Sequence, residues 1–217
     1  DVIVDDITYA TAPFFRKGLV AQAIKDVTDA GAVYFTSAGN FGNKSSEGTI
    51  PASTQNGKAT VLSGPDTLQA INLKSAGSYM IILQWEDNFY STGQTAGTAY
   101  DIDVFLTDFT GKNIVGYNRN NANSDPLEIL PFSVTGPTTV YLKIVKASGP
   151  ATPANIRFKY VIFRGNAEIV NNPNPNPSTI IGHANAAEAI TVGAVQFNLT
   201  PSYGVTNKVR VESFSSW

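Results

Sequence analysis

Ser37-Ala38-Gly39-Asn40 is the stretch whose residue types and order are best suited to chemistry. It follows the apolar run 33–36, and ligands of α/β sheets bind where such strands end. Glycine lets a substrate backbone come close, and the Asn40 amide is a neutral donor that can stabilise a developing oxyanion. The same four residues are also typical of a plain strand-to-loop turn, because Gly39 and Asn40 tolerate positive φ. This stretch alone leaves both interpretations open.

Cysteine is absent and histidine occurs once, at His183. The first fact excludes disulfides, thiol catalysis and thiolate metal sites. The second means that a histidine base within this chain would have to be His183. This residue lies in Gly182-His183-Ala184-Asn185, a connection before an apolar run, and we expect a structural or surface histidine there rather than a catalytic one.

Charge and hydropathy exclude two classes of partner. The 15 basic and 17 acidic side chains nearly cancel, so no electrostatic footprint for nucleic acid or an anionic membrane surface is present. No apolar run approaches the roughly 18 residues that a membrane-spanning helix needs. We therefore expect no nucleic acid partner and no membrane span.

The elements that position the 37–40 stretch alternate between strand and helix. Val2-Ile3-Val4 is a short β-branched strand that ends in the polar pair Asp5-Asp6. Residues 19–27 carry apolar side chains at helical spacing, between a proline and a glycine that are typical of helix ends. A second strand, 32–36, follows. Strand, helix and strand in this order predict a right-handed crossover in a parallel sheet.

The composition and periodicity of the sequence change after Asn40. Residues 41–58 are rich in small and polar side chains and predict a loop. From 59 to 163 the sequence alternates between short β-like runs and turn signals, which predicts an antiparallel sandwich or jelly roll of about eight strands. The predicted strands are 60–62, 68–73, 78–85, 101–107, 114–117, 127–134, 138–145 and 156–163.

The proline-rich run 169–177 predicts a linker, because alternating prolines cannot continue a ladder. Beyond it, 179–181, 190–195 and 209–214 are strand-like. We therefore predict four parts: residues 1–55 and 178–217 as two pieces of one α/β core, 56–168 as an inserted β-sandwich, and 169–177 as the linker. The expected fold class is α/β, with a partial parallel sheet and an all-β antiparallel insertion.

The order of the motifs resembles the subtilisin-like serine proteases. The segments concerned are Tyr34-Phe35-Thr36-Ser37-Ala38-Gly39-Asn40, then Ile190-Thr191-Val192-Gly193-Ala194, then Ser213-Phe214-Ser215-Ser216. The resemblance covers residues 1–52 and 178–217 and implies an incomplete subtilisin-like core. It also implies secretion or a cell-surface or periplasmic location in a bacterium.

The resemblance implies roles for individual residues. Asn40 matches the oxyanion-hole asparagine, and Ser37, Ala38 and Gly39 match the backbone of the specificity pocket. Asp6, Ile7 and Thr8 match the strand that pairs with a polypeptide substrate, although the family usually has Ser-Leu-Gly there. The family's catalytic aspartate and histidine lie before the equivalent of Asp1 and its serine lies after that of Trp217, so we expect this chain alone to be inactive.

The middle segment resembles the bacterial pre-peptidase C-terminal domains, which are jelly-roll modules of secreted proteases. The residues concerned are 101–112, 127–129 and 139–144. The resemblance implies a role in substrate access, secretion or surface binding. Some related modules bind calcium, for which Asp101, Asp103 and Asp108 are candidates. Strand alternation favours a solvated face for Asp101 and Asp103, so we assign no metal and no cofactor.

Two functions from different classes remain. The first is part of a serine endopeptidase in which the sandwich modulates access of substrates. The alternative is a binding module for protein or carbohydrate whose working part is the sandwich, with Trp85, Phe89 and Tyr90 able to stack on a sugar ring or to serve as core or rim aromatics. Exposed edges of an incomplete sheet further predict dimerisation or swapping.

Overall fold

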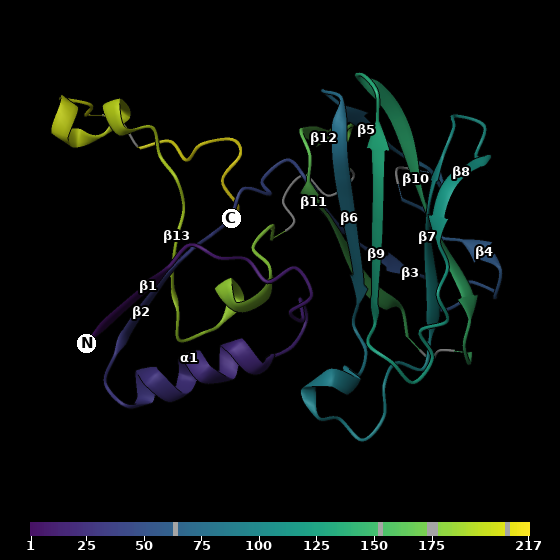
Figure 1. Cartoon of the computed structure of the whole chain (residues 1–217), viewed down its shortest axis with the longest axis horizontal. Helices are drawn as coiled ribbons and strands as arrows, with labels where there is room; N and C mark the ends of the chain where they lie inside the picture. The colour runs from purple at the N-terminus through teal and green to yellow at the C-terminus, as the bar shows by residue number, and fades with distance from the viewer. Residues whose placement is uncertain (63–64, 152–153, 173–177, 207–208) are drawn as a thin grey trace. The chain divides into compact units, whose positions relative to one another are not determined.

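The chain forms two compact units (Figure 1). The computed structural model describes residues 1–62, 65–151, 154–172, 178–206 and 209–217. Residues 1–43 and 178–217 together form one unit, called the split unit here, and residues 44–177 form the other, called the sandwich. The sandwich thus begins earlier than the predicted boundary after residue 55, because the strand Ser45–Ile50 pairs within it.

The split unit contains a small parallel sheet. Its strands are β1 (Val2–Asp5), β2 (Val33–Ser37) and β13 (Ile190–Val192), in the order β1-β2-β13. Val4 aligns with Phe35, and Phe35 with Ile190. All three strands run the same way, so their carboxyl ends meet at one edge of the sheet. The unit also contains the short 3-10 turns η2 (Gly182–Asn185), η3 (Phe197–Leu199) and η4 (Pro201–Tyr203).

The helix α1 (Leu19–Asp29) connects β1 to β2 and buries one apolar side. Ala21 and Ile24 are its buried residues, as the three-residue spacing requires. Gly18, at the N-cap, has no side chain that could cap the helix. Helices of this length are marginally stable alone, so tertiary packing must stabilise α1.

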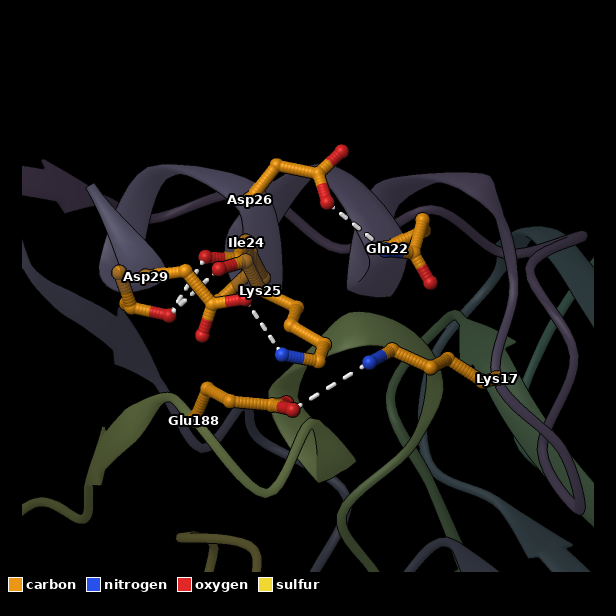
Figure 2. A network of polar contacts seen from close by, with 8 residues as sticks. Lys17, Gln22, Ile24, Lys25, Asp26, Asp29 and Glu188 are labelled. Carbon is orange, nitrogen blue, oxygen red and sulfur yellow. Dashed lines mark hydrogen bonds and ion pairs between the residues drawn. The ribbon is translucent and has the colours of Figure 1, made fainter.

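The solvent side of α1 carries a network of polar contacts, which Figure 2 shows. Gln22 Nε2 donates to Asp26 Oδ1 at 2.8 Å, one turn along the helix, and Lys25 pairs with Asp29 in the same way. Glu188, from the segment before β13, pairs with Lys17 at 3.3 Å. Exposed pairs of this kind contribute little to stability, because solvent screens their charges, so this network does not account for the stability of the helix.

Two antiparallel sheets form the sandwich. One has the order β12-β5-β10-β7-β8, with β4 paired to β10, and the other has the order β3-β11-β6-β9. The strands are β3 (Ser45–Ile50), β4 (Lys58–Ala59), β5 (Gln69–Leu73), β6 (Gly77–Trp85), β7 (Asp101–Thr107), β8 (Asn113–Tyr117), β9 (Leu127–Val134), β10 (Thr138–Ser148), β11 (Ile156–Arg164) and β12 (Ala167–Ile169). A short turn, η1 (Tyr90–Thr92), follows β6.

The inner faces of the two sheets enclose the main hydrophobic core. Trp85, Phe158 and Tyr160 are its largest fully or almost fully buried side chains. Leu142 on β10 alternates with less buried neighbours, as expected for a strand with one buried face, whereas Ile81 and Ile82 on β6 are both fully buried. The buried Trp85 indole donates from Nε1 to Thr98 Oγ1 at 2.9 Å, so its polar atom is satisfied inside the core.

The predicted fold class is wrong. Antiparallel strands make up most of the regular structure, α1 is the one α-helix among the described residues, and the parallel sheet has three short strands. The chain is therefore mainly β rather than α/β. Two runs expected to enlarge the parallel sheet do not do so: 179–181 is not a strand, and 209–214 contributes a single bridge between Val211 and Val195.

Other local expectations also change. The run 41–58, predicted as a loop, contains β3, because its backbone pairs with β11. Residues 6–8, which the resemblance matched to the strand that pairs with a substrate, are irregular. Of the predicted linker, 173–177 lies outside the described residues, while its first residue, Ile169, ends the strand β12.

Candidate functional site

An open cavity of about 450 Å³ lies at the carboxyl ends of the three parallel strands. This is the edge at which sheets of this kind bind ligands. Nine residues, three around the end of each strand, line it: Val4, Asp5, Asp6, Phe35, Thr36, Ser37, Val192, Gly193 and Ala194. The predicted site residues Asp6 and Ser37 are among them.

The turn after β2 has a defined backbone. Ala38 is buried and its N–H donates to the Val192 carbonyl at 2.9 Å, which continues the parallel ladder. Gly39 has φ +83°, and a Cβ there would lie 2.8 Å from the Phe41 ring. A side chain at this position would be both strained and crowded, so glycine is required for the turn. The interpretation of Gly39 as a positive-φ turn residue is thus correct, and it does not compete with a functional role.

Asn40 is exposed at the end of this turn. Within the described part of the chain no hydrogen bond holds its side-chain amide. The amide is therefore available to a ligand, which is the property that an oxyanion donor needs.

Hydrogen bonds of Ser215 and Ser216 hold the turn and the neighbouring end of β13. Ser216 N–H donates to the Gly39 carbonyl at 2.8 Å, and Phe41 N–H donates to Ser216 Oγ at 3.0 Å. Ser215 Oγ accepts from Ala194 N–H at 3.0 Å on the β13 side. Both serines are almost fully buried. Sequence reasoning included them in a motif but gave them no task, because their partners are far away in the chain.

The predicted substrate strand is only partly at the cavity. Asp6 lines it, whereas Ile7 and Thr8 continue beyond the described lining. Ile7 is half exposed, at 52%. β1 is an edge strand, so an extended peptide has a free side of the sheet to approach.

Asp5 is a site residue that sequence reasoning did not single out. Its carboxylate accepts hydrogen bonds from the Tyr34 and Thr36 hydroxyls, and His183 Nε2 lies 3.1 Å from Oδ2. Burial alone would raise the pKa of Asp5, but the hydrogen bonds from Thr36 and Tyr34, together with His183, hold this pKa below its usual value. The available signal was its position, a carboxylate directly after a β-branched strand.

His183 is structural, as expected, and it is buried rather than on the surface. Its side chain is 1% exposed, and the Tyr9 ring packs edge-on against it with centroids 5.4 Å apart. Nε2 also lies 3.3 Å from Thr36 Oγ1, while buried Nδ1 has no partner among the described residues. The imidazole thus connects η2 to the ends of β1 and β2 and braces the edge on which the cavity lies.

The calcium candidates of the sandwich have different surroundings. Asp108 is partly exposed, and its carboxylate accepts hydrogen bonds within its own turn from Thr110 N–H and Lys112 N–H. Asp103 is 8% exposed, so the predicted solvated face is wrong for it. Burial raises the pKa of Asp103 to about 6, and the negative charge of Asp101 adds to the effect. Over the described ranges, no three acidic, histidine or cysteine side chains group as a metal site.

The three aromatic candidates for sugar stacking also differ in burial. Trp85 and Phe89 are core residues with 0% and 1% exposure, whereas Tyr90 is 60% exposed. The first two therefore cannot stack on a sugar.

In the described part of the chain, no helix combines the length and apolar character needed to cross a bilayer.

Comparison with known proteins identifies no family. No protein-family profile matches the chain, and no curated protein matches it. Among solved structures, the CspB protease of Clostridium perfringens is similar over 99% of this chain and 44% of its own, with 14% identity and a TM-score of 0.42. The VP2 subviral particle of infectious bursal disease virus is similar over 63% of this chain and 37% of its own, with 13% identity and a TM-score of 0.23. The chain spans less than half the length of either protein, and at these TM-scores neither similarity bears on function.

Proposed function

We propose that this chain supplies the oxyanion-stabilising turn and part of the substrate cleft of a serine endopeptidase of the subtilisin type. Asn40 donates its amide hydrogen to the oxyanion that develops when the scissile carbonyl is attacked. The backbone of Ser37, Ala38 and Gly39 forms one wall for the substrate side chain. The nucleophile and its base belong to parts of the enzyme that this chain does not include.

One observation supports the proposal: Asn40 is exposed, its amide has no hydrogen bond to a described residue, and it lies three residues after Ser37, which lines the cavity at the carboxyl ends of the parallel strands. Preorganised donors stabilise a transition state because they do not reorganise when charge develops. The hydrogen bonds between Ser216 and the turn support this preorganisation: Ser216 N–H donates to the Gly39 carbonyl, and Ser216 Oγ accepts from Phe41 N–H.

The substrate runs along the outer side of β1 in an extended conformation. Asp6, Ile7 and Thr8 pair with it by adding a strand to the edge, a common mode of peptide recognition. The open cavity beyond the strand ends accepts a side chain of the substrate. Asp6 is the acidic group of this segment and favours a basic residue nearby.

The test compares Asn40→Ala with the wild type in the full-length protein. A fluorophosphonate probe should label the serine of the wild type, and labelling and kcat should fall by about 10²–10³-fold in the variant, as for subtilisin when its oxyanion donor is removed. KM should change little, because the interaction forms in the transition state. Asn198→Ala, at an exposed position in η3, is the matched control.

Equal labelling of Asn40→Ala and wild type would remove Asn40 from the oxyanion hole. No labelling of a folded full-length protein would overturn the hydrolase assignment altogether. A role of the sandwich in access is tested separately, by replacing residues 44–177 with a short glycine-serine linker. Cleavage of folded proteins should then change while cleavage of small peptides does not, and equal changes in both would exclude that role.

A further inference from the structure

We propose that the outer face of the larger sandwich sheet carries a binding site for a neutral carbohydrate. A cavity of about 370 Å³ lies there, within the range of about 300–1,000 Å³ that is usual for small-ligand sites. Nine residues of the sandwich line it: Asp66, Thr67, Leu68, Gln69, Ala70, Phe109, Tyr141, Val170 and Asn171. This site is independent of the peptide cleft proposed above.

Two aromatic side chains border the cavity. Tyr141 is half-buried on β10, where it aligns with Ala70 of β5, and Phe109 is 76% exposed in the turn between β7 and β8. An exposed phenylalanine has no reason from packing to occupy a turn. The π-face of such a ring is electronegative and attracts the weakly positive C–H groups on the face of a pyranose ring.

The turn that carries Phe109 is rigid. The Asp108 carboxylate accepts from Thr110 N–H at 2.9 Å, from Thr110 Oγ1 at 2.6 Å and from Lys112 N–H at 3.1 Å. Lys143 Nζ donates to the Gly111 carbonyl at 3.1 Å from the neighbouring strand. These bonds hold the backbone on both sides of Phe109, so little backbone entropy is lost when a ligand stacks on the ring, which favours binding.

The polar side chains of the lining can form hydrogen bonds with the hydroxyl groups of a sugar. The exposed Asp66 carboxylate accepts hydrogen bonds, the Thr67 hydroxyl donates and accepts, and the exposed Asn171 amide does both. Asn171 also has φ +47°, a conformation that few residues other than glycine adopt. Two hydrogen bonds hold the Gln69 side chain in the lining: its Nε2 donates to the Val170 carbonyl at 2.5 Å and to the Ala70 carbonyl at 3.1 Å.

The backbone around the cavity argues against a peptide strand as the ligand. β5, which contributes Gln69 and Ala70 to the lining, is paired on one side with β10 and on the other with β12, so this strand has no free side for a peptide; the edge strand on this side of the sheet is β12. Asp66 is the one charged residue of the lining. A site with an aromatic wall, hydroxyl-matching groups and a lining strand that is paired on both sides suits a polyol ring better than an extended chain.

The experiment titrates the 217-residue chain with three soluble probes, cellohexaose, chitohexaose and mannohexaose, and follows amide and aromatic NMR signals. At least one should bind with a millimolar or lower Kd and shift the signals of Phe109 and Asn171. Phe109→Ala should weaken binding about tenfold, Phe109→Trp should retain it, and Asp66→Asn should weaken it severalfold. Tyr90→Ala removes another exposed aromatic side chain, which lies outside the cavity lining, and should bind as the wild type does.

Each other result overturns the proposal. No binding of any probe at millimolar concentration excludes a carbohydrate site, and binding that Tyr90→Ala weakens as much as Phe109→Ala shows nonspecific contact. A lysine-containing peptide that binds at the same residues, while the three sugars do not, would reassign the cavity to a peptide. Phe109 is exposed, so an unchanged unfolding curve for its variants will confirm that they are folded.

Discussion

Replacing Glu128 with glutamine should remove a large pH dependence from the stability of the sandwich. Glu128 lies on β9, beside Leu83 of β6, and is 0% exposed. Neither carboxylate oxygen has a well-formed hydrogen bond to a described residue. Burial raises the pKa of Glu128 from 4.5 to about 8, and the positive charge of Arg119 and the amide of Asn121 oppose this only in part.

The sign and size follow from linkage. The folded state keeps the Glu128 proton up to a pKa of about 8, whereas the unfolded chain releases it near pH 4.5. The stabilising effect of the neutral carboxyl is therefore complete below pH 4.5 and is lost as the pH rises towards 8. The full slope is roughly 1.4 kcal/mol per pH unit and is reduced near each pKa, so the wild type should lose about 3–4 kcal/mol between pH 5 and pH 8 through this residue.

The assay is urea unfolding at several pH values. Trp85 is buried in the sandwich core, so a Trp217→Phe background makes its fluorescence report on that unit. Glu128→Gln cannot ionise, and its free energy of unfolding relative to the wild type should rise steadily with pH over this range. Glu86→Gln, at an exposed position after β6, is the control and should show no such trend. A difference between Glu128→Gln and wild type that is constant with pH would refute the reasoning.

Three further changes test the rest of the structure. Ser216→Ala removes the acceptor of the Phe41 N–H bond and should lower the free energy of unfolding of the split unit by about 1–2 kcal/mol, measured by urea unfolding. Because the pKa of Asp5 is lowered, its carboxylate stabilises the fold at neutral pH, and this stabilisation is lost as the pH falls from 3.8 through the lowered pKa. In thermal unfolding, the melting temperature of Asp5→Asn should not show this fall at acid pH. Gly165→Ala should destabilise the sandwich by more than about 2 kcal/mol, because φ is +100° and a Cβ would lie 2.0 Å from the Tyr79 ring; a melting temperature equal to that of the wild type would contradict this.

The sequence alone located most strands and the helix. The predicted runs 101–107 and 127–134 coincide with β7 and β9, and the helix lies between the proline and glycine expected at its ends. These elements depend on local alternation, local turns and helical spacing, all of which are properties of neighbouring residues. The turn at Gly39 could be predicted for the same reason, since its positive φ follows from the residue type.

Only the tertiary structure decided which segments pair and what is buried. β3 is a strand because β11, more than a hundred residues later, supplies its partner, and a polar run with no alternation gives no local sign of this. Asp103 alternates as a surface residue would, yet packing of other segments covers it. The predicted α/β class failed for a related reason, because residues 179–181 and 209–214 have the composition of strands but bond elsewhere.

The candidate site shows the same division. Asn40, Ser37 and Asp6 could be proposed from residue types at strand ends, where chemistry and position coincide in the sequence. The contact between Asp5 and His183, 178 positions apart, could not, because a long-range hydrogen bond leaves no pattern in a single sequence. Residue types and local spacing thus determined the candidate donor, whereas the folded chain alone decided what holds it in place.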